Sequence, residues 1–441
     1  MNNVDHIVYA DYLLPMDKTL SIIPKGAAAI KDGKIIDVGP FDTINSTYFA
    51  KKLTGGKNRV IFPGLVNAHT HAAMVYFRGM ADDLPLKEWL EKHIWPAEAH
   101  MLSNEFVHDA VELACLEMLK SGITLFNDMY LFKKAVAAAV KKQGMTAVLG
   151  AGILDFPTKA ASTSDEYLAR AEEFLTEWSQ DEDITPAVAP HAVYTCSPET
   201  LKKSQKLAEK YNVPIHIHLA ETRWERDDCK RQHNLTPVAY LNSIDFLSSR
   251  VIAAHCIWIS DQEISMLAKS QTSVAHCIKS NLKLASGFAP VVQMLNAGVK
   301  VAFGTDGAAS NNTLDILSEM SLSSKLHKAI NTDPTALNDK QSLLMATRWG
   351  AEALGRGHIT GSLEKGKNAD LVIANLEKPH LIPLYDIYSH IVYAMKSSDI
   401  ELVMVKGKIV IENGTLTTYD EREIFDRARL WQRKIKAALE G

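Results

Sequence analysis

Two histidines one residue apart form the first motif in the chain that could do chemistry. His69 and His71 follow the segment Pro63-Gly64-Leu65-Val66-Asn67-Ala68. Because side chains alternate between the two faces of a β-strand, residues i and i+2 point the same way. An extended His-x-His segment therefore directs both imidazoles toward one point, as two ligands of one metal ion must be directed. The pair alone is a modest signal, and a metal site needs further ligands.

Further residues of metal-ligand or acid–base type stand where later apolar segments end. They are His191, His218, Glu221, His255 and Asp306. His216 shares a strand face with His218 and competes with it for the ligand role, but His218 is nearer the strand end. Each residue alone has an ordinary explanation, since most histidines are structural and Asp306 before Gly307 can be a turn residue. Their joint placement at the ends of such segments argues against coincidence.

The middle of the chain alternates short apolar strands with helical segments. The predicted strands cover 61–68, 123–128, 147–153, 185–189, 213–218, 251–255, 273–276 and 299–304. Helix starts are indicated by Ser103, by Ser197-Pro198 and Thr236-Pro237, and by the capping box Ser260-Asp261-Gln262-Glu263. These repeats predict a (β/α)8 TIM barrel of the α/β class, with its chemistry at the C-terminal ends of the strands.

The two ends of the chain have a different texture, with short strands and tight turns. Asp32-Gly33 separates two apolar runs, which is a strong hairpin signal, and similar strands recur near the C-terminus. Neither end can bury a sheet face alone. We therefore expect residues 1–60 and 361–441 to build one small β-sandwich domain, the latter also forming a terminal helix. The catalytic barrel is expected at 61–360.

The composition is that of an ordinary globular protein, with 46% hydrophobic and 23% charged residues. The net charge of −4 gives no electrostatic footprint for nucleic acid. The five cysteines are scattered without a Cys-x-x-Cys motif, which argues against a disulfide framework and a zinc knuckle. The sequence shows no signal peptide and no membrane-spanning run. We expect a cytoplasmic protein that binds a small molecule, not nucleic acid or a membrane, with a homo-oligomer as an open possibility.

The predicted metal ligands are three imidazoles and one carboxylate: His69, His71, His218 and Asp306. This set suits one divalent ion, most simply Zn²⁺, which lowers the pKa of a bound water from about 15.7 to about 7. Glu221, three residues after His218, can donate a proton to the group under attack. His255 can hold the water, and Asp306 can take its proton and pass it to a leaving group. The set predicts hydrolytic attack on an electrophilic carbon.

These motifs resemble those of the amidohydrolase superfamily. The matching segments are Pro63 to His71, His218-Leu219-Ala220-Glu221, His255, Gly304-Thr305-Asp306-Gly307, Gly33-Lys34-Ile35-Ile36 and Lys367 to Val372. Many dinuclear members carry a carboxylated lysine at the end of strand four, where this chain has Pro190-His191. The resemblance therefore implies the mononuclear branch, and His-x-x-Glu after strand five implies its deaminases.

Shorter segments resemble the 5′-methylthioadenosine/S-adenosylhomocysteine deaminases of that superfamily. They are Trp89 to Glu98, Pro190 to Thr195, Ser280 to Gly287 and Asp306 to Asn312. The resemblance implies that Glu98 binds the ribose hydroxyls, that Trp89 lines the nucleoside pocket and that His191 hydrogen-bonds the purine. Glu221 would protonate the ring nitrogen and, like Asp306, contact the substrate as hydroxide attacks C6.

The expected reaction converts 5′-methylthioadenosine to its inosine analogue and ammonia. Some members that accept S-adenosylhomocysteine carry an arginine at the exit of strand three, whereas Gly150 to Pro157 contains none. This favours 5′-methylthioadenosine or adenosine as substrate. The alternatives are a guanine deaminase or triazine-type chlorohydrolase on the same site, and a non-catalytic barrel relative, against which the full ligand set argues. Ser310 is expected to cap a helix at 314–326 rather than contact substrate.

Overall fold

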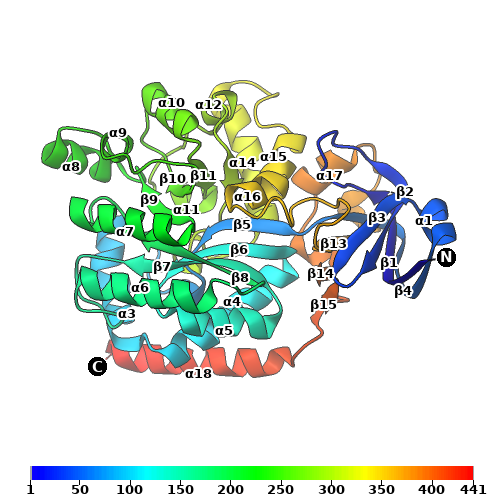
Figure 1. Cartoon of the computed structure of the whole chain (residues 1–441), viewed down its shortest axis with the longest axis horizontal. Coiled ribbons are helices and arrows are strands. Elements are labelled where there is room, and N and C mark those ends of the chain that lie inside the picture. Colours follow the sequence, from blue (N-terminus) through cyan, green and yellow to red (C-terminus); the bar gives the residue numbers. More distant parts are fainter. Residues whose placement is uncertain (1, 441) are drawn as a thin grey trace. The chain divides into compact units, whose positions relative to one another are not determined.

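The core of the protein is an eight-stranded sheet whose strands follow chain order (Figure 1). The computed structural model describes residues 2–440. The strands are β5 (Leu65–Thr70), β6 (Ile123–Tyr130), β7 (Thr146–Ile153), β8 (Ile184–Pro190), β9 (Ile215–Leu219), β10 (Val251–His255), β11 (Ser273–His276) and β12 (Val301–Phe303). Neighbours from β7 to β12 pair in parallel. Just after β12, the Asp306 N–H donates to the His69 carbonyl of β5 at 2.9 Å. The predicted (β/α)8 barrel is confirmed.

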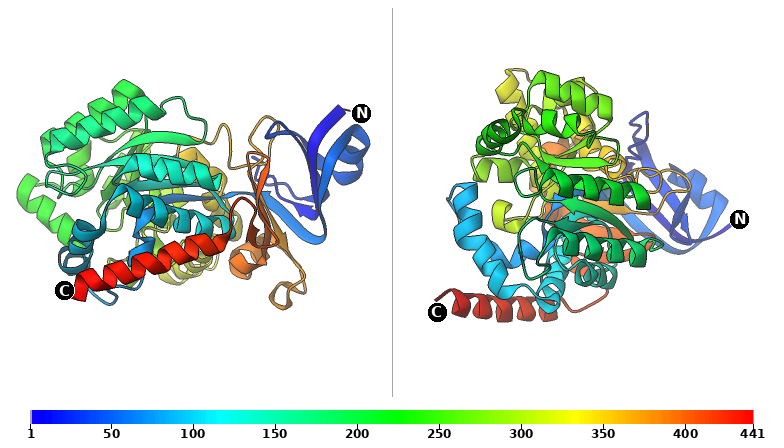
Figure 2. Two further views of the ribbon diagram at one scale, coloured as in Figure 1. Left: turned by 90° about the horizontal axis from the view of Figure 1, so that it is seen from below. Right: turned by 60° about the vertical axis from the view of Figure 1, so that its left-hand side comes forward.

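Helices connect these strands and lie outside them (Figure 2). They include α4 (Asn104–Lys120), α5 (Lys133–Gln143), α6 (Ser164–Trp178), α7 (Pro198–Tyr211), α8 (Arg223–His233), α9 (Pro237–Ser243), α10 (Asp261–Ser270), α11 (Ile278–Lys283) and α12 (Val291–Asn296). Ser197 accepts from the Thr200 N–H at the start of α7, and Ser260 and Glu263 form the predicted capping box of α10. These side chains pair N–H groups that a helix start leaves without an intrahelical partner.

The predicted first barrel strand, 61–68, is wrong at its start. Residues up to Pro63 belong to β4 (Tyr48–Pro63), which pairs with β13 (Leu371–Asn375) in another sheet, and β5 begins after Gly64. A Cβ at Gly64 would lie 2.1 Å from the Thr124 hydroxyl oxygen, so the close approach requires glycine. The apolar run continues through this point, and hydrophobicity alone therefore cannot locate the change of sheet.

The two ends of the chain form a second eight-stranded sheet, in the order β16-β15-β14-β13-β4-β1-β2-β3. Its other strands are β1 (Asn2–Leu13), β2 (Ile23–Lys31), β3 (Lys34–Pro40), β14 (Ile400–Val405), β15 (Lys408–Glu412) and β16 (Thr415–Leu416). The turn at Asp32-Gly33 joins β2 to β3, as predicted. One apolar cluster includes Val8, Ile30 and Met404, so the expected joining of both ends in one β-layer is confirmed.

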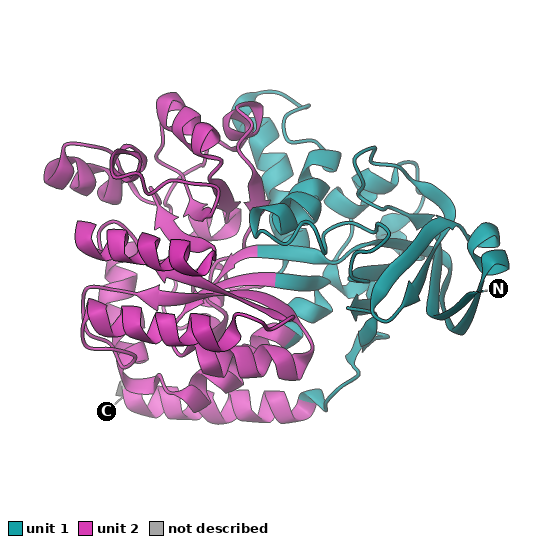
Figure 3. Ribbon diagram, viewed as in Figure 1, with its two compact units in different colours: residues 1–67, 116–125, 315–421 teal, residues 68–115, 126–314, 422–441 magenta. Residues whose placement is uncertain are grey.

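The residues group into two compact units (Figure 3). Residues 1–67, 116–125 and 315–421 form the first, which holds the terminal sheet and α14 (Ile316–Asn331). Residues 68–115, 126–314 and 422–441 form the second, which holds every predicted site residue. Across residues 2–440, no helix combines the length and apolar character needed to cross a membrane.

Within the second unit, the terminal helix α18 (Glu421–Glu440) is held to α4 by charges. Arg427 pairs with the buried Glu112 and with Asp109, and the Trp431 indole N–H donates to Asp109 at 3.0 Å. Lys142 also pairs with Glu112 at 2.6 Å. The cluster of acidic side chains around Glu112 is therefore neutralised by two basic residues.

Replacement of Arg427 by Ala should destabilise the protein. Removing one partner of a buried ion pair costs about 3–5 kcal/mol, and we expect about 2 kcal/mol because Arg427 is 29% exposed and Lys142 remains beside Glu112. The check is the midpoint of thermal unfolding. Arg429→Ala on the same helix, which removes an exposed pair with Asp426, should leave the midpoint nearly unchanged. Equal midpoints for both variants would contradict this role of Arg427.

Candidate active site

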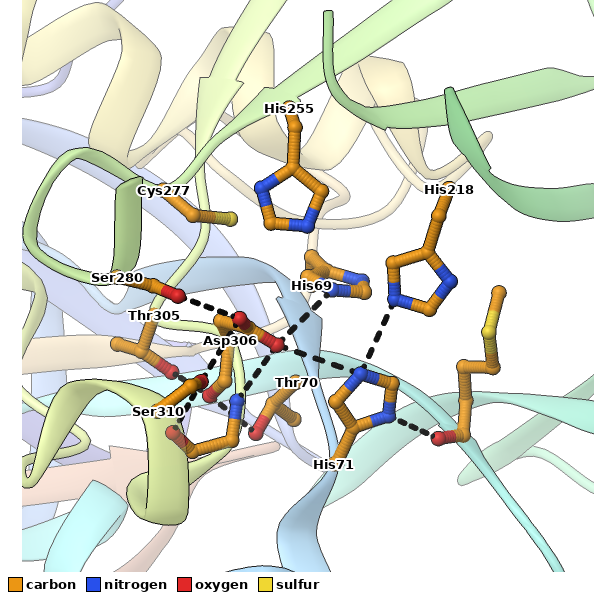
Figure 4. A network of polar contacts seen from close by, with 12 residues as sticks. His69, Thr70, His71, His218, His255, Cys277, Ser280, Thr305, Asp306 and Ser310 are labelled. Carbon is orange, nitrogen blue, oxygen red and sulfur yellow. Dashed lines mark hydrogen bonds and ion pairs between the residues drawn. The ribbon is translucent and has the colours of Figure 1, made fainter. Parts of the chain in front are cut away.

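Four predicted metal ligands lie together at the C-terminal ends of β5, β9 and β12 (Figure 4). They are His69, His71, His218 and Asp306, whose ligand atoms all lie within 4.8 Å of one another. His71 Nε2 lies 3.2 Å from His218 Nε2, and the Nε2 atoms of His69 and His71 each lie 3.3 Å from Asp306 Oδ1. Ligand atoms about 2.0–2.1 Å from a tetrahedral Zn²⁺ are roughly 3.3–3.4 Å apart. The spacing fits one such ion.

The opposite ring nitrogens of two of these histidines are fixed by the backbone. His71 Nδ1 donates to the Met129 carbonyl at 2.5 Å, and His218 Nδ1 donates to the His191 carbonyl at 2.9 Å. A carbonyl can only accept, so both Nδ1 atoms carry the proton. The Nε2 lone pairs of both rings are then directed into the cluster, as metal ligation requires.

The contact between His71 and His218 requires a positive charge. Two Nε2 lone pairs facing each other at 3.2 Å repel unless a metal ion or a proton lies between them. Burial opposes a charge on His71, but the hydrogen bond and charge of Asp306 outweigh burial and raise the pKa of His71. Burial lowers the pKa of His69 to about 4, which leaves that ring neutral at pH 7. The cluster thus favours a cation, and the Nε2 lone pairs of His71 and His218 are directed toward it.

Asp306 is held as a carboxylate by several donors. Its Oδ2 accepts from the hydroxyls of Ser280 at 2.6 Å and Ser310 at 2.8 Å. Burial would raise the pKa of Asp306, but the close contacts of its carboxylate with His69 and His71 hold that pKa well below its usual value. The prediction that Ser310 caps a helix at 314–326 is wrong, because Asp315 caps α14. Ser310 instead orients the Asp306 carboxylate.

Glu221 and His255 lie beside each other at the ends of β9 and β10. His255 Nε2 is 3.8 Å from Glu221 Oε2, and His255 Nδ1 lies 2.8 Å from the Asn281 amide oxygen, to which it donates. Below Glu221, the buried Glu225 carboxylate accepts from the N–H groups of Ala220 at 2.9 Å and Glu221 at 2.8 Å. Burial raises the pKa of Glu221, which suits a group that donates a proton near neutral pH.

A cavity of about 340 Å³ opens onto the cluster. Its wall contains His71, Trp89, Glu98, His191, His218, Glu221, His255 and Asp306. Of the predicted site residues, only His69 is absent from this wall, because its side chain is fully buried beneath the cluster. The structure therefore brings all the predicted site residues to one place.

Glu98 and Tyr130 form a hydrogen-bonded pair in the cavity wall. The Tyr130 hydroxyl donates to Glu98 Oε1 at 2.5 Å. Burial raises the pKa of Glu98 to about 7, against the opposing effect of this bond. Glu98 lies in α3 (Trp95–Met101) and Trp89 ends α2 (Leu86–Trp89), both in the segment after β5. The pair places a carboxylate that can accept hydroxyl protons from a ligand.

Sequence reasoning missed Tyr130, Glu225 and the buried pair of Asp128 with Lys133. Asp128 Oδ1 accepts from the Ala72 N–H at 2.7 Å and so supports the turn after His71. Tyr130 and Asp128 stand at the end of β6, where the strand-end rule applied to the other strands would have found them. Nothing in the sequence marked Glu225 as a site residue, because glutamate is common in the first turn of a helix.

Comparison with known proteins identifies the group to which the chain is related. The model of the amidohydrolase family matches residues 60–410. The chain belongs to the amidohydrolase family. This amidohydrolase is 54% identical to a 5-methylthioadenosine/S-adenosylhomocysteine deaminase of Thermodesulfovibrio yellowstonii (98% of each chain). It is 44% identical to a protein of the same name from Aquifex aeolicus (93% of this chain, 94% of the relative).

A solved structure agrees with these relatives. The amidohydrolase matches the crystal structure of an adenosine deaminase from Xanthomonas campestris with bound zinc, at a TM-score of 0.97 and 39% identity over 99% of both chains. The family predicted from the motifs is therefore confirmed, as is the barrel with its terminal β-layer.

Replacement of Gly304 by Ala should weaken metal binding. A Cβ at Gly304 would lie 2.8 Å from His69 Cβ and 3.0 Å from Cys277 Sγ, so it should displace His69. We expect Zn²⁺ affinity to fall about tenfold or more, measured by competition with a chelator. Gly39→Ala is the control, because its Cβ would meet only ordinary contacts at 3.8 Å. Unchanged affinity in a folded Gly304→Ala protein would contradict this packing of His69.

Proposed function

We propose that the amidohydrolase is a metal-dependent hydrolytic deaminase of 5′-modified adenosines. It would convert 5′-methylthioadenosine to the inosine analogue and ammonia. The observation that carries the proposal is one cavity that joins a four-ligand cluster, an acid–base pair and the Glu98 carboxylate. The names of the relatives at 54% and 44% identity support the same activity.

The proposed cofactor is one divalent metal ion, most simply Zn²⁺. His69, His71, His218 and Asp306 would hold it, and their spacing and donor types support this choice. Such an ion supplies a nucleophilic water at neutral pH. Its affinity should fall with acid, because protons compete for the same ring nitrogens.

The chain's own acid–base groups account for the protons. Glu221 gives a proton to the purine ring nitrogen next to C6, which makes C6 electrophilic. Asp306, with His255 orienting the water, takes one water proton and delivers it to the 6-amino group. A C6–O bond forms, the C6–N bond breaks and ammonia leaves. The remaining water proton returns to Glu221, and the proton on the ring nitrogen stays in the inosine analogue.

Three wall residues suit a nucleoside. A vicinal diol needs an acceptor for two hydroxyl protons, which the Glu98 carboxylate offers. Trp89 is 5% exposed and presents an aromatic wall for a flat base. Burial lowers the pKa of His191 to about 3, so its neutral ring can hydrogen-bond a purine nitrogen.

The cavity also favours an apolar 5′ substituent. Its wall contains Leu86, Leu90 and Phe156, and the Phe156 ring lies 5.5 Å from Trp95. Aromatic and aliphatic surfaces bind a thioether methyl group well. The ammonium group of Lys159 in this wall already donates to the His100 carbonyl at 2.7 Å. A methylthio group therefore fits better than the zwitterion of S-adenosylhomocysteine.

The alternative substrates use less of this wall. Guanine and a triazine ring have no ribose, so the half-buried Glu98 carboxylate would face no diol, and a desolvated polar group without a matching partner costs binding free energy. A non-catalytic relative would gain nothing from the paired Glu221 and His255 beside the cluster. We also propose a reducing, cytoplasmic setting, because all five cysteines are buried and none forms a disulfide within residues 2–440.

The proposal is tested by a substrate panel on zinc-loaded protein. The panel contains adenosine, 5′-methylthioadenosine, S-adenosylhomocysteine and guanine, with ammonia release as the readout. We expect the highest kcat/KM for 5′-methylthioadenosine. Faster turnover of guanine, or no turnover of any nucleoside by zinc-loaded protein, would overturn the proposal.

Glu221→Gln should abolish most turnover without releasing the metal. The amide cannot donate a proton as the carboxylic acid does, and such catalysis contributes about 10²–10⁴-fold. Zinc content by elemental analysis should equal that of the parent protein, because Glu221 is not among the four clustered ligands. Full activity in this variant would remove Glu221 from the mechanism.

Binding of the nucleoside product should tighten as pH rises through about 7. With its pKa raised to about 7, Glu98 is protonated below that pH and is a carboxylate above it. Only the carboxylate can accept from both ribose hydroxyls. Calorimetric titration with 5′-methylthioinosine between pH 5.5 and 8.5 measures the effect. Glu98→Gln should flatten the profile, whereas an identical profile in both proteins would contradict the role of Glu98.

A further inference from the structure

The three clustered histidines differ in what fixes the nitrogen that faces away from the cluster. His71 and His218 each donate from Nδ1 to a backbone carbonyl. The Nδ1 atom of His69 faces a side chain instead of a backbone carbonyl, and it lies 2.8 Å from Nε2 of His216. The two rings meet edge to face, with centroids 4.8 Å apart and planes at 89°. The orientation of His69 therefore depends on the side chain of His216, which a substitution can remove.

His216 is placed behind the cluster and not in it. It lies in β9 two residues before His218 and is fully buried. Its Nε2 faces His69 Nδ1, on the side of the His69 ring away from the clustered Nε2. His216 is therefore not a fifth ligand.

The proton positions follow from the role of His69. If His69 Nε2 offers its lone pair to a metal ion, the proton of the neutral ring is on Nδ1. His69 Nδ1 then donates, and His216 Nε2 must accept. The proton of His216 is left on its own Nδ1, which is buried and has no hydrogen-bond partner among residues 2–440. A buried ring nitrogen without a partner is rare and calls for a reason.

We infer that His216 is a positioning residue that fixes the tautomer and orientation of His69 for metal binding. The unpartnered Nδ1 is the consequence of using Nε2 as the acceptor for His69. This inference rests on the metal site proposed above. The two fail differently, since zinc binding by the parent protein tests the site, and the dependence of that binding on His216 tests the inference.

Two variants separate an acceptor role from simple filling of the core. His216→Leu removes the acceptor, and we expect Zn²⁺ affinity to fall about 10–100-fold, as for other residues that hold a metal-ligating histidine. His216→Gln offers an amide oxygen in place of Nε2 and should restore affinity to within about threefold of the parent protein. Affinities are measured by chelator competition on the whole chain. His327→Leu, at a buried histidine of α14, is the matched control and should bind zinc like the parent.

Parent-like zinc affinity in His216→Leu would overturn the inference, as would an equal loss in the Leu and Gln variants.

A second measurement uses the parent protein alone and does not depend on whether a variant folds. Nitrogen-15 NMR of histidine-labelled, zinc-loaded parent protein reports which ring nitrogen carries the proton. We expect the His216 ring to carry its proton on Nδ1 and to have a bare Nε2. A proton on Nε2 of that ring would show that His216 donates to His69, contrary to the inference.

Discussion

The 3.2 Å contact between the Nε2 atoms of His71 and His218 is the interaction on which the site depends. Carbonyl groups of Met129 and His191 fix the protons on the far sides of both rings, so the near sides are lone pairs held together. Only a positive charge makes that arrangement favourable. The barrel thus builds a place for a cation from backbone geometry, and the side chains around it supply the rest of the chemistry.

Bringing these groups together requires unusual backbone at the strand ends. Ala220, His255 and Asp306 have φ values of 51°, 74° and 61°, in the left-handed region that non-glycine residues rarely adopt. Each such residue costs on the order of 1–3 kcal/mol. Glu225 offsets part of that cost by accepting the Ala220 and Glu221 N–H groups. The turns direct the side chains into the barrel mouth, where the reaction is proposed to occur.

The sequence predicted those parts of the site that depend on side-chain alternation along a strand and on position at a strand end. Alternation along β5 and β9 placed His69, His71 and His218, and strand ends located His255 and Asp306. Periodicity indicates which face of a strand a residue occupies, but not which residues it contacts there. The pairing of Glu98 with Tyr130, the support of Glu221 by Glu225 and the hydrogen bond from Ser310 to Asp306 join segments far apart in the chain or within one turn. The first depends on packing between distant segments, and the other two depend on the local backbone conformation, which periodicity does not report.

The metal cluster and the nucleoside wall can be tested separately, and the cluster comes first. X-ray absorption at the zinc edge of the loaded protein measures the ligand set directly. The account predicts three imidazole nitrogens and one or two oxygens at about 2.0–2.2 Å. A sulfur neighbour at about 2.3 Å, which Cys277 beside the cluster could supply, or a second metal ion nearby, would contradict it.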